Sequence, residues 1–464
     1  MITQLHEGNI EEILDLEKGS FIPQLQAEKS TILKRLGLGH SILGNYEGND
    51  LVAMVSYLYT NFNPRDPSTF PKTHKDFSLQ PIPENPNAVV IISLGIKPER
   101  RARGLAQELL KAVGEEAKKH GCLYGVADGR CPSYNGSPQE DIKQNPEFKN
   151  IIGQYLNKGI VPSQEDFLKD PLLAFYHRTS GCGFLDVIPD FFPEDEPSGG
   201  LRVILYKYLD KIISLSKEWS ILARIMYGQE YIEQLADFLI QSGVETVLEC
   251  GCGDGYISKG LAERGLKVTA LDSDPEMVYL AFNNSVHPNV DYKLMNWLDL
   301  DKLAEKFDCV ICRGNSISSV SSWGKEEEYN PNIARERIKK SIGVFFRRLK
   351  DNGMLYVDTT KESLDIDAIR KLGVDIAETG GGIEFEVKRE DFHLKGKIEH
   401  DLARRTRRTY GRGTLEGEEF SVSSTSYLMT PGELEGIIRS HNPSEIWIPN
   451  LPHERYYHVI CAMK

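Results

Sequence analysis

The chain has 464 residues, more than one hydrophobic core usually supports, so two or three domains are expected. Its 68 acidic and 55 basic side chains give a formal net charge of -13, which argues against a nucleic-acid partner. No apolar run is long enough to cross a bilayer. Residues 1–6 lack the basic start and apolar core of a secretory signal, so we expect a soluble, cytoplasmic protein.

The first predicted site lies where an apolar strand, Val89–Ile96, runs into a basic turn, Lys97–Arg103. A helix follows at Leu105–Lys118, with its apolar residues at helical spacing. Unpaired amides at a helix N-terminus attract anions, and so do the basic side chains of the turn. The sequence therefore predicts a phosphate cradle at this turn.

The turn itself, Arg101-Ala-Arg-Gly-Leu-Ala106, resembles the Q/RxxGxG/A element of GNAT-type acetyltransferases. In that family the backbone amides of this element wrap the pyrophosphate of coenzyme A. The resemblance implies a GNAT fold over residues 1–208, an α/β domain with a mixed, mostly antiparallel sheet, and acetyl-CoA as cofactor. It also implies that seven residues bind the coenzyme, namely Leu94, Ile96, Arg101, Arg103, Gly104, Leu105 and Ala106.

A long polar insertion with several Pro and Gly residues extends from about 130 to 170. Long loops in compact domains tend to be functional or disordered. Arg130 and Tyr134 could therefore bind an acceptor substrate there. Solvent-facing loop residues are the alternative interpretation for both side chains.

Two segments after the insertion, Asp170–His177 and Gly183–Asp190, resemble the last helix and the final strands of the GNAT family. In many relatives a Tyr after a Phe protonates the leaving thiolate of coenzyme A, which makes Tyr176 the candidate catalytic acid. The extra stretch Arg178–Cys182 departs from the family's spacing. An ordinary packing tyrosine is the alternative for Tyr176.

After a connector expected to be largely helical, residues 209–242, an apolar strand runs into alternating glycines: Val247-Leu-Glu-Cys-Gly-Cys-Gly-Asp-Gly255. Glycine permits the turn and removes Cβ atoms that would block a ligand, while the next helix offers its N-terminal amides. A dinucleotide fingerprint needs Gly or Ala where Tyr256 stands, so NAD is not the expected ligand.

The following strand, Lys267–Asp272, ends in a carboxylate about 20 residues after the first glycine, the spacing at which an acid reaches a ribose diol. Asp272 is therefore the predicted ribose ligand, and a helix N-cap is its alternative role. With Glu249 in front, the glycine run resembles the E/DxGxGxG signature of class I S-adenosylmethionine methyltransferases. The resemblance implies S-adenosylmethionine as cofactor, bound by Glu249, Gly251, Cys252, Gly253, Gly255, Asp272, Ser273 and Met277.

Two later segments, Asn296–Asp301 and Phe307–Ser316, resemble the glycine N-methyltransferase branch of that family. The resemblance extends from about Tyr231 to the C-terminus. It implies a Rossmann-like, seven-stranded domain over residues 243–464, with a terminal antiparallel hairpin. It further implies adenine contacts from Asn296, Trp297 and Leu298, a cofactor contact from Arg313 and a substrate contact from Asn315. A core aromatic is the alternative for Trp297.

The chain departs from that branch at the acceptor site. The glycine enzymes carry an Arg after the fifth strand that binds the acceptor carboxylate, but this chain reads Tyr356-Val-Asp-Thr-Thr-Lys361. Arg313 replaces an apolar residue of the family pattern, and a guanidinium there could bind a carboxylate or phosphate in forked geometry. Glycine itself is therefore not the expected acceptor.

No metal site is expected from the eight cysteines. Cys309 and Cys312, three apart on a predicted strand, point to opposite faces and cannot hold one metal together. The basic run Arg404–Arg412 could bind RNA or an anionic acceptor. A charged strand in an antiparallel extension, neutralised by nearby acids, is the favoured interpretation because an acidic protein repels polyanions.

Together these motifs predict a bifunctional transferase that acetylates and methylates a small amine-bearing metabolite. An acetylated nitrogen has its lone pair delocalised into the carbonyl, so the two groups would go to different atoms. Alternatively, the first half is an acetyl-CoA-sensing module that regulates a small-molecule methyltransferase. A protein or RNA acceptor is a third hypothesis, and the oligomeric state is left open.

Overall fold

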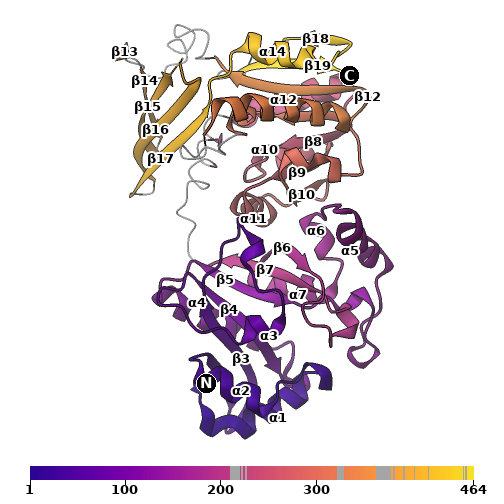
Figure 1. Cartoon of the computed structure of the whole chain (residues 1–464), viewed down its shortest axis with the longest axis vertical. Helices are drawn as coiled ribbons and strands as arrows, with labels where there is room; N and C mark the ends of the chain where they lie inside the picture. The colour runs from indigo at the N-terminus through magenta and orange to yellow at the C-terminus, as the bar shows by residue number, and fades with distance from the viewer. Residues whose placement is uncertain are drawn as a thin grey trace. The chain divides into compact units, whose positions relative to one another are not determined.

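The computed structural model describes residues 1–209, 220, 223–224, 227–320, 329–361, 378–379, 382–389, 392–401, 403–415, 417–452, 454 and 457–464. The chain divides into two compact units, Met1–Ile212 and Ile213–Lys464 (Figure 1). Helix α9 (Gln229–Gln241), which lies within the predicted connector, packs into the core of the second unit. Residues 210–219 of that connector lie outside the described residues.

The first unit is built on a seven-stranded sheet with the order β1-β2-β3-β4-β5-β7-β6. Strands β4 and β5 pair in parallel, and the other neighbours pair antiparallel. The predicted mixed, mostly antiparallel sheet is therefore confirmed. The strands are β1 (Ile2–Leu5), β2 (Ser41–Glu47), β3 (Asp50–Thr60), β4 (Ala88–Ile96), β5 (Tyr124–Gly129), β6 (Gly183–Ile188) and β7 (Arg202–Tyr208).

The sequence explains how the helices of the first unit begin and pack. Helix α4 buries Leu109 and Val113 against the sheet, as its apolar spacing predicts. Asp170 caps α7 by accepting hydrogen bonds from the backbone amides of Leu172 and Leu173. The helices are α1 (Ile10–Ser20), α2 (Lys29–Gly37), α3 (His74–Ser78), α4 (Leu105–Lys119), α5 (Pro146–Lys158), α6 (Gln164–Phe167) and α7 (Pro171–Ser180).

The second unit has its own seven-stranded sheet, with the order β10-β9-β8-β11-β12-β19-β18. The first five strands of this order run parallel, and β19 and β18 close the sheet as an antiparallel pair. This is the predicted Rossmann-like arrangement. The strands are β8 (Thr246–Cys250), β9 (Lys267–Asp272), β10 (Val290–Leu294), β11 (Phe307–Cys312), β12 (Leu349–Thr360), β18 (Glu445–Trp447) and β19 (Tyr457–Met463).

The helices of the second unit pack on this sheet through apolar faces. Gly260 lets α10 approach α9 closely, because a Cβ there would lie 2.5 Å from a methyl carbon of Ile232. The remaining helices are α10 (Tyr256–Glu263), α11 (Pro275–Asn284), α12 (Pro331–Arg348) and α14 (Pro431–Arg439). Among the described residues, no helix combines the length and apolar character needed to cross a membrane.

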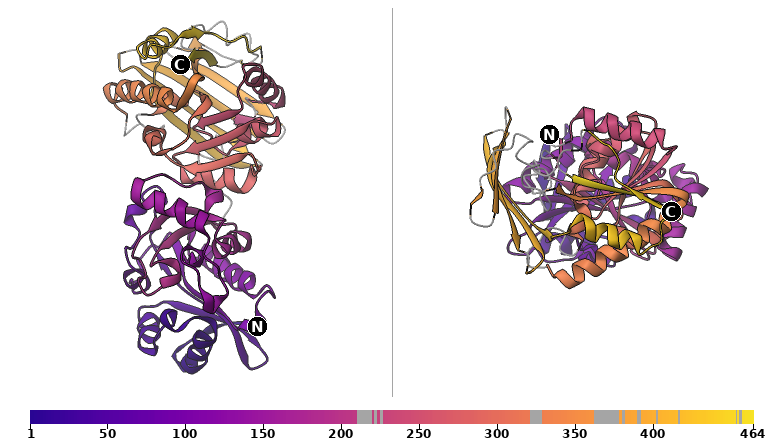
Figure 2. Two further views of the ribbon diagram at one scale, coloured as in Figure 1. Left: turned by 90° about the vertical axis from the view of Figure 1, so that its right-hand side faces the viewer. Right: turned by 90° about the horizontal axis from the view of Figure 1, so that it is seen from above.

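A separate five-stranded antiparallel sheet stands to one side of the parallel sheet in the second unit (Figures 1 and 2). It contains the predicted antiparallel extension with the arginine run, and it buries a small apolar cluster of Phe392, Leu394 and Val422. Its strands are β13 (Glu378–Thr379), β14 (Gly382–Arg389), β15 (Phe392–Asp401), β16 (Thr406–Leu415) and β17 (Glu418–Tyr427).

Candidate functional site

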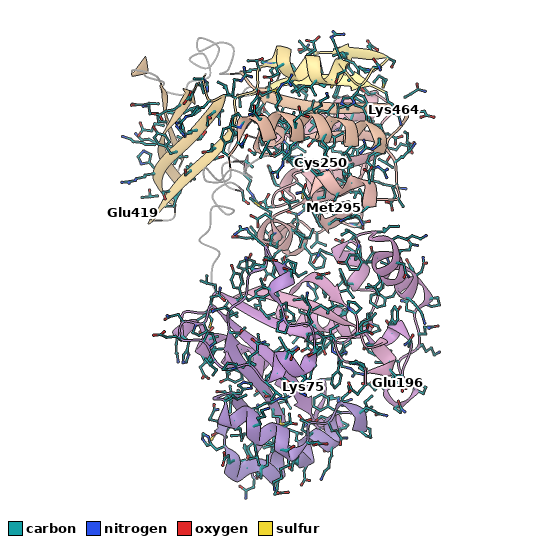
Figure 3. The ribbon with its side chains drawn as sticks, in the orientation of Figure 1. Lys75, Glu196, Cys250, Met295, Glu419 and Lys464 are labelled. Carbon is teal, nitrogen blue, oxygen red and sulfur yellow. The ribbon has the colours of Figure 1, made fainter. Side chains whose placement is uncertain are left out.

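The glycine run of the second unit lies at the carboxyl end of β8, where the strand order reverses. Figure 3 marks this edge by Cys250, the last residue of β8, and Met295, which follows β10. Gly251, Gly253 and Gly255 have φ values of 79°, 58° and 74°, which favour glycine. A Cβ on Gly255 would also lie 2.5 Å from the hydroxyl of Tyr292.

Asp272 lies at the carboxyl end of the adjacent strand and is hydrogen-bonded to the glycine loop. Its Oδ2 accepts from the amide of Gly253 at 3.0 Å, and its Oδ1 accepts from the amide of Asp274 at 2.9 Å. Burial raises the pKa of Asp272 to about 6. The N-cap of α11 is Asp274, whose side chain accepts from the amide of Glu276, so Asp272 is not the helix cap. The backbone of Ser273, the next residue, also hydrogen-bonds to Asp272, and Met277 of α11 has its Sδ 3.9 Å from a Cβ built on Gly253.

The predicted adenine residues follow β10. Asn296 caps the short helix η8 (Trp297–Lys302) by accepting a hydrogen bond from the amide of Leu298 at 2.9 Å. Trp297 is 4% exposed and donates a hydrogen bond to Ser341 at 3.0 Å. A Cβ on Gly251 would lie 3.1 Å from its ring. Trp297 therefore packs as a core aromatic, and its ring also borders the glycine loop.

Glu249 and Arg313 form a buried ion pair next to this loop. Arg313 donates from Nε to Glu249 Oε1 at 3.3 Å, and Ser258 donates to Oε2 at 2.6 Å. The guanidinium lies over the ring of Tyr227, 4.6 Å from its centroid, and also faces Tyr231. Although burial opposes the charge, Tyr231 and Glu249 raise the pKa of Arg313, so it is a permanent cation.

The loop after β11 is held by Asp358, a fully buried residue of β12. Its two oxygens accept hydrogen bonds from the amides of Gly314 and Asn315 at 2.9 and 2.8 Å. Burial, followed by repulsion from Glu454, raises the pKa of Asp358 to about 7. The side chain of Asn315 accepts a hydrogen bond from Ser318. Asp358 and Tyr227 were not among the residues predicted from the sequence, although a carboxylate inside an apolar strand was a usable signal for Asp358.

In the first unit, strands β4 and β5 part at the predicted coenzyme site. Their parallel pairing ends at Ile91 and Ala127, so β4 residues 92–96, including Leu94 and Ile96, extend beyond it. Backbone amides and carbonyls in this stretch can pair with an amide-bearing ligand.

The predicted phosphate turn follows, and φ is 60° at Ala102 and 83° at Gly104. No described atom lies within 4 Å of a Cβ built on Gly104, so the position needs glycine for its backbone conformation. Arg101 donates a hydrogen bond to the carbonyl of Ser20, and Arg103 is exposed. Leu105 and Ala106 are buried at the start of α4, whose N-terminal amides face the turn.

Tyr176, the candidate acid, lies on α7. Burial raises the pKa of its hydroxyl, which makes it a weaker acid than an ordinary tyrosine. Its electrostatic neighbours are Arg130, Arg202 and Asp128. Arg202 is 4% exposed, and its Nε lies 3.3 Å from Asp128 Oδ2, an oxygen that also lies 3.3 Å from Nδ1 of His74. Arg202, Asp128 and His74 were not among the residues predicted from the sequence.

The two predicted acceptor residues of the insertion are engaged in its packing. Arg130 donates to both oxygens of Glu140 at 2.8 and 2.9 Å, and to both oxygens of Asp195 at 3.0 Å. Tyr134 lies under the ammonium of Lys149, 5.2 Å from the ring centroid, and a Cβ on Gly199 would lie 2.9 Å from that ring. Either side chain could bind an acceptor substrate only in addition to these contacts.

The arginine run, which begins just before β16 and continues along it, has acidic neighbours within the chain. Arg405 pairs with Glu433 and lies over the ring of Tyr427, and Arg408 stands opposite Glu399 in the sheet. These contacts support the interpretation as a neutralised, charged strand. Within the described part of the chain, no cluster of His, Cys, Asp and Glu side chains could hold a metal ion.

Comparison with known proteins gives two family matches. Residues 10–132 match the model of the acetyltransferase (GNAT) family, and residues 247–328 match the model of a methyltransferase domain. A glycine/sarcosine/dimethylglycine N-methyltransferase of Actinopolyspora halophila is 32% identical over 139 residues, covering 28% of this chain and 21% of that protein. A glycine/sarcosine N-methyltransferase of Aphanothece halophytica is 29% identical over 143 residues, covering 30% of this chain and 48% of that protein.

The chain thus spans from about a fifth to about half of the length of these curated relatives. Among solved structures, the CcbJ methyltransferase from Streptomyces caelestis is 18% identical, with a TM-score of 0.40 over 50% of this chain and 88% of that chain. The loading GNATL domain of CurA from Lyngbya majuscula is 19% identical, with a TM-score of 0.36 over 45% of this chain and 97% of that chain. By the family matches and curated relatives, the chain joins a GNAT-type domain to a class I S-adenosylmethionine-dependent methyltransferase domain that resembles the glycine N-methyltransferase branch.

Proposed function

We propose that the chain is a bifunctional transferase that moves an acetyl group from acetyl-CoA and a methyl group from S-adenosylmethionine to a small amine-bearing metabolite. The observation that carries the proposal is the hydrogen bond of the Asp272 carboxylate to the amide of Gly253 at the reversal of strand order. An acid beside a loop without Cβ atoms is the arrangement that a nucleoside site requires, and it supports the methyl-transfer half of the proposal.

For methyl transfer, the sulfonium already carries an activated methyl group. The protein's residues therefore have to align the acceptor nitrogen and exclude water. In this proposal Asp272 binds the ribose, and Gly251 and Gly253 let the methionyl part approach the backbone. The loop at Gly314 and Asn315, fixed by Asp358, faces the methyl group.

For acetyl transfer, the exposed edge of β4 and the turn before α4 bind coenzyme A in this proposal. The neutral hydroxyl of Tyr176 protonates the leaving thiolate; burial raises the pKa of this hydroxyl, but the charges of Arg130 and Arg202 lower it and so favour release of the proton. Asp128, near the end of β5 where the strands part, is among the charges near Tyr176, and its carboxylate lies 3.3 Å from the ring of His74 on α3.

One observation favours a regulatory first unit as the second candidate. Arg130 and Tyr134, the acceptor residues that the sequence suggested, are held within the insertion by Asp195, Glu140 and Lys149. A unit that senses acetyl-CoA needs the coenzyme cradle without an acceptor site. It would bind the coenzyme and consume none.

The test measures each half-reaction separately in the full chain, with single amines, one donor at a time and mass detection of the product. Gly104→Glu should remove acetyl transfer alone, and Gly253→Glu should remove methyl transfer alone. Gly48→Glu and Gly265→Glu are matched controls, because both glycines have positive φ and no described atom within 4 Å of an added Cβ. Methylation with acetyl-CoA bound but unconsumed would establish the regulatory alternative.

A further inference from the structure

Two neighbouring buried polar atoms of the second unit have no hydrogen-bond partner among the described residues: the hydroxyl of Tyr227 and Nη1 of Arg313. Tyr227 is 5% exposed, and the side chain of Arg313 is 9% exposed. The guanidinium lies over the Tyr227 ring, and a Cβ on Gly314 would lie 3.3 Å from the Tyr227 hydroxyl. Buried polar groups are nearly always paired, so two adjacent exceptions beside this loop call for a ligand.

The charges around this pair decide what kind of ligand fits. The positive charge of Arg313 is already matched by Glu249, which its Nε contacts. Asp358, a second buried carboxylate, lies close enough to interact with the same guanidinium. The pair thus offers hydrogen-bond donors without a surplus of positive charge.

A ligand carboxylate would be a further anion next to one guanidinium, and burying an uncompensated charge is far more costly than burying a neutral carbonyl. The sulfonium of the proposed methyl donor adds one positive charge. With it, two positive charges face Glu249, Glu454 and, once it is ionised, Asp358, so no positive charge is left to match a further anion. A neutral oxygen acceptor therefore fits this position better than the carboxylate of a free amino acid.

We propose that Tyr227 and Arg313 bind a neutral amide carbonyl of the methyl acceptor, which is an amine that also carries an N-acyl or carboxamide group. This inference rests on the proposed methyl transfer. The free amine attacks the methyl carbon, the carbon–sulfur bond breaks with its electron pair left on sulfur, and the new ammonium loses a proton to water. The amide nitrogen is not nucleophilic, so the methyl group goes to the free amine. Because the acceptor carries an amide, an acyl-transfer reaction of the type proposed for the first unit would supply it.

The test compares two pairs of amines as methyl acceptors for the full chain: glycine with glycinamide, and 1,3-diaminopropane with its mono-N-acetyl derivative. In each pair the second member presents a neutral amide carbonyl. The inference predicts a higher kcat/KM for that member, by tenfold or more. Equal or better use of glycine and of the unacylated diamine would overturn the inference, while methyl transfer itself would uphold the proposed function.

The variant Tyr227→Phe separates carbonyl binding from differences in amine basicity. It removes the hydroxyl alone, so the preference for the amide-bearing acceptor should fall about 3- to 10-fold through KM, the effect of one hydrogen bond. Because that hydroxyl is unpartnered, the melting temperature of the ligand-free variant should not fall. Tyr410→Phe, at an exposed position on β16, is the matched control.

Three other outcomes would be decisive. An unchanged preference in Tyr227→Phe would overturn the inference. Weaker binding of S-adenosylmethionine with an unchanged preference would also overturn it and assign the donor pair to the methyl donor. If the wild-type chain methylates none of the four amines, both the proposed function and the inference are overturned.

Discussion

Asp358 gives the strongest prediction of a pH-dependent stability. Its carboxyl is fully buried, and burial raises its pKa from 3.8 to about 7. Between about pH 4 and pH 7 the folded chain therefore holds a proton that the unfolded chain has lost. The stability of the wild-type chain should fall as pH rises through this window, because the folded state must then ionise a buried acid.

The expected size follows from the shift of roughly three pKa units. At about 1.4 kcal/mol per unit, ionisation costs the folded state up to roughly 4 kcal/mol by pH 8. Asp358→Asn removes the ionisation, but its amide group faces one of the two backbone N–H donors at Gly314 and Asn315. The variant should therefore be about 1–3 kcal/mol less stable than the wild type at pH 4.

The assay is chemical denaturation of both proteins at pH 4, 5, 6, 7 and 8. The stability of Asp358→Asn relative to the wild type should rise steadily with pH and should be most favourable at pH 8. Asp351→Asn is the matched control, because this acid lies on the same strand with its side chain 97% exposed. A difference between Asp358→Asn and the wild type that stays constant within about 1 kcal/mol would refute the buried-acid reasoning.

Three further predictions concern the two sites. Asp272→Asn should weaken S-adenosylmethionine binding about 10- to 100-fold by calorimetry, as the loss of charge-assisted hydrogen bonds to a ribose requires, and unchanged affinity would contradict the ribose role. Tyr176→Phe should lower the kcat of acetyl transfer about 100-fold without changing coenzyme affinity, and an unchanged kcat would assign Tyr176 to packing. Asp195→Asn should destabilise the first unit by about 3–5 kcal/mol in thermal unfolding, since Arg130 and Arg202 would lose a shared buried partner; a neutral effect would show that the cluster does not need that charge.

Local patterns were sufficient to predict the parts of both sites that depend on short stretches of chain. The apolar strand before Gly251, the acid at Asp272 and the turn at Gly104 each need a specific backbone conformation or spacing. The structure contains the corresponding strands and positive φ values. The fold class followed from the resemblance of these motifs to two families.

Contacts between distant segments were not predictable in the same way. Arg130 contacts Asp195, which lies 65 positions away in the sequence. The insertion was expected to contact the acceptor substrate, but its Arg130 side chain is held by this contact. Tyr227 approaches Arg313 from a segment outside the family match, and no spacing rule links the two. The arginine run was attributed to a charged strand, but its membership of a separate five-stranded sheet depends on pairings that the sequence does not specify.

The central claim, that one chain transfers both groups to one small molecule, is tested most directly by incubating the full chain with a single diamine and both donors. Mass spectrometry would then show whether acetyl and methyl groups accumulate on the same product. The account predicts a doubly modified amine, formed through a singly acetylated species. Products that carry an acetyl group or a methyl group, but never both on one molecule, would contradict it.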